Sequence, residues 1–120
     1  MTNAATQFHF NRYLQLSAAV TRQVEEFNRE EDARIVAAIK SGSMFESAWR
    51  AQHTSAVQAR IDEEHWVAEG YEGHSGVPMV KLSQIYRLVQ ELKPIMENAQ
   101  SLSAAQELAL EYACMAANIA

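Results

Sequence analysis

Apolar residues recur every three or four positions along most of the chain, whereas the strict alternation typical of half-buried strands is missing. The first apolar stripe consists of Phe10, Tyr13, Ser17, Val20, Val24 and Phe27. It lapses at Glu31 and Arg34 and resumes on a shifted face at Ile35. Asn28 and Glu31 have the spacing of a capping box, so either a second helix begins there or one long helix changes its packing partner.

Clear helix boundary signals follow. Gly42 is suited to ending a helix, and Ser43 with Glu46 fits the S-x-x-E capping box that begins one. The next apolar stripe consists of Phe45, Trp49, Gln52, Ala56 and Ala59, followed by Trp66 and Val67. A helix from residue 43 to about residue 69 would be roughly 40 Å long. A compact domain of this size does not need that length, so the pattern predicts a protruding helix.

Two further helices are predicted in the last third of the chain. The cleaner stripe consists of Leu82, Ile85, Val89, Leu92 and Met96. Pro94 lies inside it and lacks an N–H, which predicts a kink or break near residues 92–93. Ser103 and Gln106 form a second capping box. The stripe expected to face the core in the last helix is Ala105, Leu108, Tyr112, Met115 and Ile119.

These patterns predict an all-α fold, with four to five amphipathic helices in a helical bundle and a single domain over residues 1–120. Several apolar residues lie off the main stripes, namely Leu14, Leu16, Val57, Trp66, Leu88, Ile95 and Leu110. One small bundle can hardly cover all of them, which indicates a second buried surface. The simplest way to bury that surface is a homodimer interface, and contact with a different protein is the second.

Composition narrows the classes of function. The net charge of −5 and the pI near 5.3 disfavour broad contact with phosphates, so no nucleic-acid partner is predicted. A DNA-binding regulator stays open as an alternative, because Arg12, Arg22, Arg29 and Arg34 fall in the first third of the chain.

Cys114 is the single cysteine, which excludes an intramolecular disulfide, and its apolar context predicts burial. The N-terminal residues have neither the basic region nor the continuous apolar region typical of a signal peptide, and no apolar run approaches ~20 residues. We therefore expect a soluble, cytoplasmic protein without a membrane partner.

The stretch "EEHWVAEGYEGHSG", residues 63–76, is the richest in candidate chemistry. On a helix, His65 and Glu69 would share a face, and His74 could complete a three-ligand metal site. Di-iron bundles, however, take Glu-x-x-His motifs from two helices, and here only Asp62 and His65 have that spacing. A helix end with a glycine loop explains the stretch better, so no metal or cofactor is predicted. A metal-dependent or acid–base enzyme remains the first alternative.

The predicted function is a small cytoplasmic regulator, of the adaptor or inhibitor (antiactivator) type, that covers a hydrophobic surface of another protein. A transcription regulator is one such target. No enzymatic activity is predicted, because no serine lies in a G-x-S-x-G context and nothing next to His9 would activate it. The candidate protein-binding residues are Phe10, Tyr13, Val20, Phe27, Phe45 and Trp49. The competing interpretation is that all six belong to the chain's own core.

Overall fold

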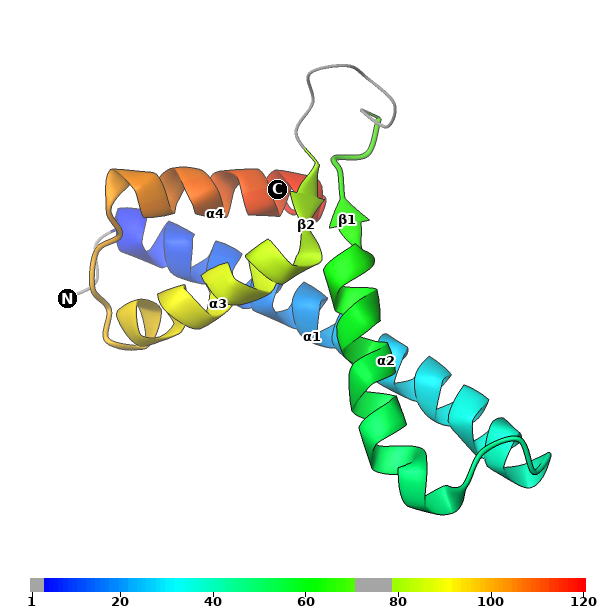
Figure 1. Ribbon diagram of the computed structural model, residues 1–120. Coiled ribbons are helices and arrows are strands. Elements are labelled where there is room, and N and C mark those ends of the chain that lie inside the picture. The colour runs from blue at the N-terminus through cyan, green and yellow to red at the C-terminus, as the bar shows by residue number, and fades with distance from the viewer. Residues whose placement is uncertain (1–3, 71–78) are drawn as a thin grey trace.

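The computed structural model describes residues 4–70 and 79–120 and confirms the predicted all-α class (Figure 1). In chain order the elements are α1 (Ala4–Lys40), the short 3₁₀ helix η1 (Glu46–Ala48), α2 (Trp49–Glu63), β1 (His65–Trp66), β2 (Val80–Lys81), α3 (Leu82–Glu97) and α4 (Ala104–Ala116). β1 and β2 form a two-residue antiparallel pair in which His65 is opposite Lys81 and Trp66 is opposite Val80.

The helices form two parts, which we call the body and the arm. The body is the first half of α1 packed against α3 and α4, and the arm is the second half of α1 with η1 and α2 (Figure 1). The arm extends away from the body, so the chain measures 58 × 37 × 18 Å. Its radius of gyration is 17.7 Å, whereas a compact chain of this length has about 13–14 Å.

A single hydrophobic core joins the body to the base of the arm. Its fully buried members include Leu16 on α1, Leu82 and Leu92 on α3, and Leu110 on α4. Phe27, Val57 and Ile61 extend the same cluster to the crossing of α1 and α2. Ile35, further out on α1, is also buried but lies outside this cluster. The outer arm therefore packs mainly on itself.

α1 is one continuous helix, which decides between the two alternatives at residue 28. The Asn28 side chain does not cap a new helix but donates a hydrogen bond to the Val24 carbonyl at 3.0 Å. The helix ends in a Schellman motif at Gly42, whose φ is +79°. The Ser43 amide donates to the Ala38 carbonyl at 3.0 Å. The prediction that Ser43 caps the next helix is therefore wrong, because Ser43 completes the end of α1.

α2 ends at Glu63, and the prediction of a helix continuing to residue 69 is wrong. Glu64 adopts an extended conformation, with φ −74° and ψ 135°. Its carbonyl then accepts a hydrogen bond from the Leu82 amide at 2.9 Å. Pairing with the segment before α3 thus replaces the next helical turn, and His65 and Trp66 become β1. The protruding element is the arm formed by two helices, not one long helix.

Two further predictions concern the break at Pro94 in α3 and the capping box at the start of α4. α3 runs unbroken to Glu97 with Pro94 inside it, so a break near residues 92–93 is not seen. Proline leaves the Gln90 carbonyl without its usual donor, and Gln90 is exposed, so water can supply one. The predicted capping box of α4 is confirmed. The Gln106 amide donates to Ser103 Oγ at 3.1 Å, and the Ser103 amide donates to Gln106 Oε1 at 2.9 Å.

Candidate protein-binding surfaces

Most of the apolar residues that lie off the predicted stripes are covered by the chain itself. Leu16, Val57 and Leu110 are buried, and Trp66, Leu88 and Ile95 pack partly buried against the core. Leu14 alone among the seven is exposed. These residues therefore do not supply the second surface inferred from the sequence.

Exposed apolar residues lie instead on α4, whose predicted orientation is wrong. The side chains facing the core are Leu110, Ala113, Cys114 and Ala116. Of the stripe expected to point inward, Ile119 packs partly buried against the core. Leu108, Tyr112 and Met115 are exposed, with 50%, 47% and 47% of their surfaces accessible to solvent. Small residues at the α1 contact let the helices approach closely, and Cys114 Sγ lies 4.0 Å from the Arg12 carbonyl oxygen. We call Leu108, Tyr112 and Met115 the α4 seam.

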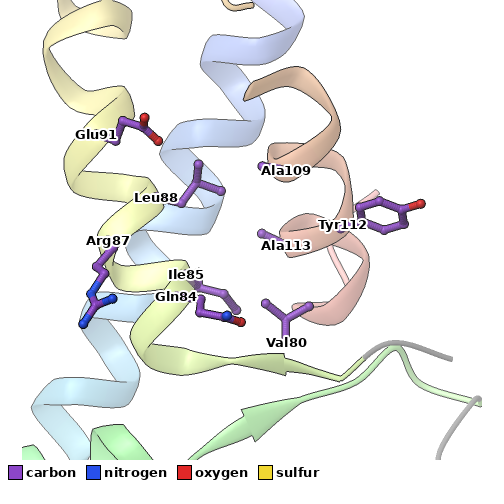
Figure 2. A pocket seen from close by; sticks show the side chains of 9 residues that line it. All are labelled: Val80, Gln84, Ile85, Arg87, Leu88, Glu91, Ala109, Tyr112 and Ala113. Atoms are coloured by element: carbon purple, nitrogen blue, oxygen red, sulfur yellow. The ribbon is translucent and has the colours of Figure 1, made fainter. Parts of the chain in front are cut away.

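An apolar groove lies beside the α4 seam, between α3 and α4, with a volume of about 620 Å³. Ile85 and Leu88 point into it from α3 toward Ala109 and Ala113 of α4 (Figure 2). Val80 closes one end (Figure 2). The groove exists because alanine side chains are too short to fill the space between the two helices.

The rim of the groove carries both charged and aromatic groups. Arg87 and Glu91 belong to its α3 side, and Tyr112 on the α4 side points away from the groove floor (Figure 2). Arg87 and Glu91 are one helical turn apart and both exposed. Neither forms an ion pair with any residue in the part of the chain that the structure describes. One positive and one negative charge are therefore available to a second molecule.

The tip of the arm presents a second apolar surface. Phe45, in the turn between α1 and η1, is 84% exposed, the highest value among the exposed large hydrophobic residues of the described chain. Next to it Trp49 stacks on His53, with ring centroids 5.2 Å apart and an interplanar angle of 14°. A cleft of about 430 Å³ lies here, lined by Val36, Ile39, Lys40, Glu46 and Trp49. We call Phe45, Trp49 and this cleft the arm tip.

Polar contacts hold the two helices of the arm together. The His53 ring donates from Nε2 to the Asn28 carbonyl at 3.1 Å. Arg60 lies over the Phe27 ring, 4.3 Å from its centroid, and pairs with Glu30 at 2.6 Å. The hydrogen bond from Arg60 is the main reason that the pKa of Glu30 lies below its ordinary value. These contacts fix where α2 crosses α1 and hence where the arm tip points.

The six residues predicted to bind a partner do not form one surface. Tyr13, Val20 and Phe27 are buried in the core, so a partner could reach them only if the helices separated. Phe10 is partly buried against the same core. Trp49 is half-buried and Phe45 is exposed, and these two lie together at the arm tip. Apolar spacing identifies residues that share a helix face, but it does not tell whether that face packs within the chain or is exposed.

The structure does not place His65 and Glu69 on one helix. His65 lies in β1, where its Nδ1 donates to the Glu63 carbonyl at 2.9 Å. The Glu69 amide donates to Asn118 Oδ1 at 2.7 Å. His74 lies outside the described residues. Within residues 4–70 and 79–120, no group of three or more histidine, cysteine, aspartate or glutamate side chains is placed to hold a metal ion.

Cys114 on α4 and two arginines on α1, Arg12 and Arg34, are held by contacts or burial within the chain. Cys114 is fully buried, and burial raises the pKa of its thiol, with Arg12 acting in the opposite direction. The Arg12 guanidinium lies over the Phe8 ring, 4.5 Å from its centroid. Arg34 pairs with Glu31 at 2.6 Å. These two arginines of the suggested DNA-binding patch are therefore engaged within the chain.

No helix in the described ranges combines the length and the apolar character needed to cross a membrane. Comparison with known proteins gives no family model, no curated protein and no solved structure that matches the chain. What this protein does must therefore be argued from its own surfaces.

Proposed function

We propose that this protein acts by binding another protein, as a regulator of the adaptor or inhibitor type, and that it covers an apolar surface of its partner with the arm tip. The observation that carries the proposal is Phe45, which is 84% exposed at the end of an arm. Its ring contributes almost no burial to the chain's own fold. No catalytic group is needed for this activity.

The energetics of the arm tip suit such a contact. Burying a phenylalanine side chain contributes about 1.5–3 kcal/mol, which reaches the range of residues that dominate an interface. The cleft beside Phe45 can accept one apolar side chain of the partner against Val36, Ile39 and Trp49. Lys40 and Glu46 at the same cleft have opposite charges, which favours one orientation of the bound partner.

The rigidity of the arm supports the same role. His53 and Arg60 bind α2 to one turn of α1, at Asn28 and Glu30, so the arm tip is positioned before a partner arrives. A preformed surface loses less conformational entropy on binding than one that must be ordered. The arm therefore presents its exposed aromatic group in a form suited to recognition.

The test compares three baits in native lysate: the wild-type chain, Phe45→Ser, and Phe8→Ser as the matched control. Phe8 is also exposed but lies on the body. A protein retained by the wild type and by Phe8→Ser, and lost with Phe45→Ser, is the predicted partner. Titration with the purified partner should then show binding at least about tenfold weaker for Phe45→Ser. Equal retention of all partners by Phe45→Ser would refute the proposal.

A further inference from the structure

We propose that two copies of this chain associate through the groove face, which we define as the groove between α3 and α4 together with the α4 seam. The copies are related by a two-fold axis perpendicular to the helices, so that α3 and α4 of one copy run antiparallel to those of the other. The product is a four-helix bundle of α3, α4 and their equivalents. This inference is independent of the proposed function, because it uses the body and not the arm tip.

The apolar part of the groove face is complementary to itself. The seam residues Leu108, Tyr112 and Met115 are spaced by four and three positions, so the stripe is nearly symmetric about its centre. In an antiparallel pair the Leu108 side chain of one copy therefore meets Met115 of the other, and the two Tyr112 rings lie near the axis. Ala109 and Ala113 leave the space that these larger side chains need.

The charged rim fits the same arrangement. Reversing the direction of α3 in the second copy places Arg87 of each chain opposite Glu91 of the other, which gives two equivalent ion pairs. A parallel arrangement would instead bring like charges together. Tyr112 lines the same groove as Arg87 and Glu91, so one axis can serve both the apolar seam and the charged rim. This charge complementarity selects a second copy, in antiparallel orientation, as the occupant.

The chain has enough exposed surface for a stable dimer. Its accessible surface is 7935 Å², of which a dimer interface needs to cover about a tenth. A standard interface removes about 800 Å² from each partner. The arm points away from α4 in Figure 1, so it leaves the seam open.

The first experiment measures the oligomeric state by sedimentation equilibrium at micromolar concentration. The wild type should be a dimer. Tyr112→Asp should weaken the dimer at least about a hundredfold, because each copy would bury an unpaired carboxylate. Leu14→Asp is the matched control, since Leu14 is similarly exposed but lies on α1 outside the groove face, and it should stay dimeric. Circular dichroism of each variant verifies that the helices are intact.

The second experiment tests the reciprocal ion pairs. Arg87→Glu and Glu91→Arg each place like charges opposite each other, so each variant alone should dimerise about tenfold more weakly. An equimolar mixture of the two variants should form a heterodimer as tight as the wild type. Electrostatic effects within one chain cannot produce that recovery on mixing.

Several results would overturn the inference. They are a wild-type chain that is monomeric throughout the micromolar range, a dimer indifferent to Tyr112→Asp, and a mixture no tighter than its two components. Capture of a different protein on the groove face by a monomeric wild type would do the same. Phe45→Ser should remain dimeric, and Tyr112→Asp should still retain the partner of the arm tip. Failure of one proposal is therefore distinguishable from failure of the other.

Discussion

Replacing Ala99 by glycine is expected to stabilise the protein. Ala99 follows α3 and has a left-handed backbone, with φ +52°. It occupies the position in a Schellman motif that glycine usually holds. Its amide donates to the Met96 carbonyl at 3.1 Å, and the Gln100 amide donates to the Ile95 carbonyl at 2.9 Å. Both hydrogen bonds involve only the backbone, so they survive the substitution.

The size of the effect follows from the conformation and exposure of Ala99. For an L-residue the left-handed conformation costs about 1–2 kcal/mol, and glycine is free of that cost. Glycine loses more entropy on folding, which offsets about 0.4–1 kcal/mol. Ala99 is exposed, so no packed contact is lost. The net gain is about 0.5–1 kcal/mol, and Tm should rise by roughly 2–5 °C.

The assay is thermal and urea unfolding followed by circular dichroism, with all variants at the same protein concentration because association changes apparent stability. Asn118→Gly is the matched control. Asn118 has φ +59°, which asparagine tolerates well, and its Oδ1 accepts the Glu69 amide at 2.7 Å. Losing that hydrogen bond should cost about 0.5–1 kcal/mol. A lower Tm for Ala99→Gly would show that the backbone there is not left-handed and would refute the reasoning.

Three further predictions concern the core, the thiol and the arm. Leu16→Ala should cost about 3–5 kcal/mol, whereas Leu14→Ala, two positions away and exposed, should change stability by less than about 0.5 kcal/mol; equal shifts in urea unfolding would mean that α1 is rotated. Cys114 should resist a thiol reagent in the folded chain and react once urea unfolds it, and rapid reaction without urea would contradict its burial. The pKa of Glu30 is lowered by Arg60, so the stability from this pair is complete above the ordinary glutamate pKa and is lost as the pH falls through the lowered value. Arg60→Met should therefore lose less stability between neutral and acid pH than the wild type, and parallel losses in urea midpoint would contradict this.

The sequence predicted well those features that depend on neighbours along the chain. The capping box of Ser103 and Gln106 and the helix end at Gly42 are local hydrogen-bond patterns, and both occur in the structure. The stripe of α3 was also predicted well, because Leu82, Ile85, Leu92 and Met96 all face the core. In these places local preference and tertiary packing favour the same result.

Other boundaries depend on partners that lie far away in the sequence. α2 stops at Glu63 because the Glu64 carbonyl accepts from the Leu82 amide, which lies beyond residues 71–78. The apolar spacing within residues 43–69 therefore cannot show that the helix ends at Glu63. The expectation that His65 and Glu69 share a helical face was wrong for the same reason, because the helix ends before both residues. Ser43 fits two motifs in sequence, the cap of the next helix and the end of α1, and the structure has the second.

α4 shows most clearly what periodicity leaves undetermined. A repeat of three and four identifies residues that share a face, but it does not identify what that face packs against. Here Leu110 and the small residues Ala113, Cys114 and Ala116 turn inward, and Leu108, Tyr112 and Met115 turn outward. A helix with two apolar faces has more apolar surface than one chain can cover, and the uncovered face adjoins a groove with its own unpaired charges. The stripe that looks like core in the sequence is, on our proposal, core after all, but of the dimer and not of the monomer.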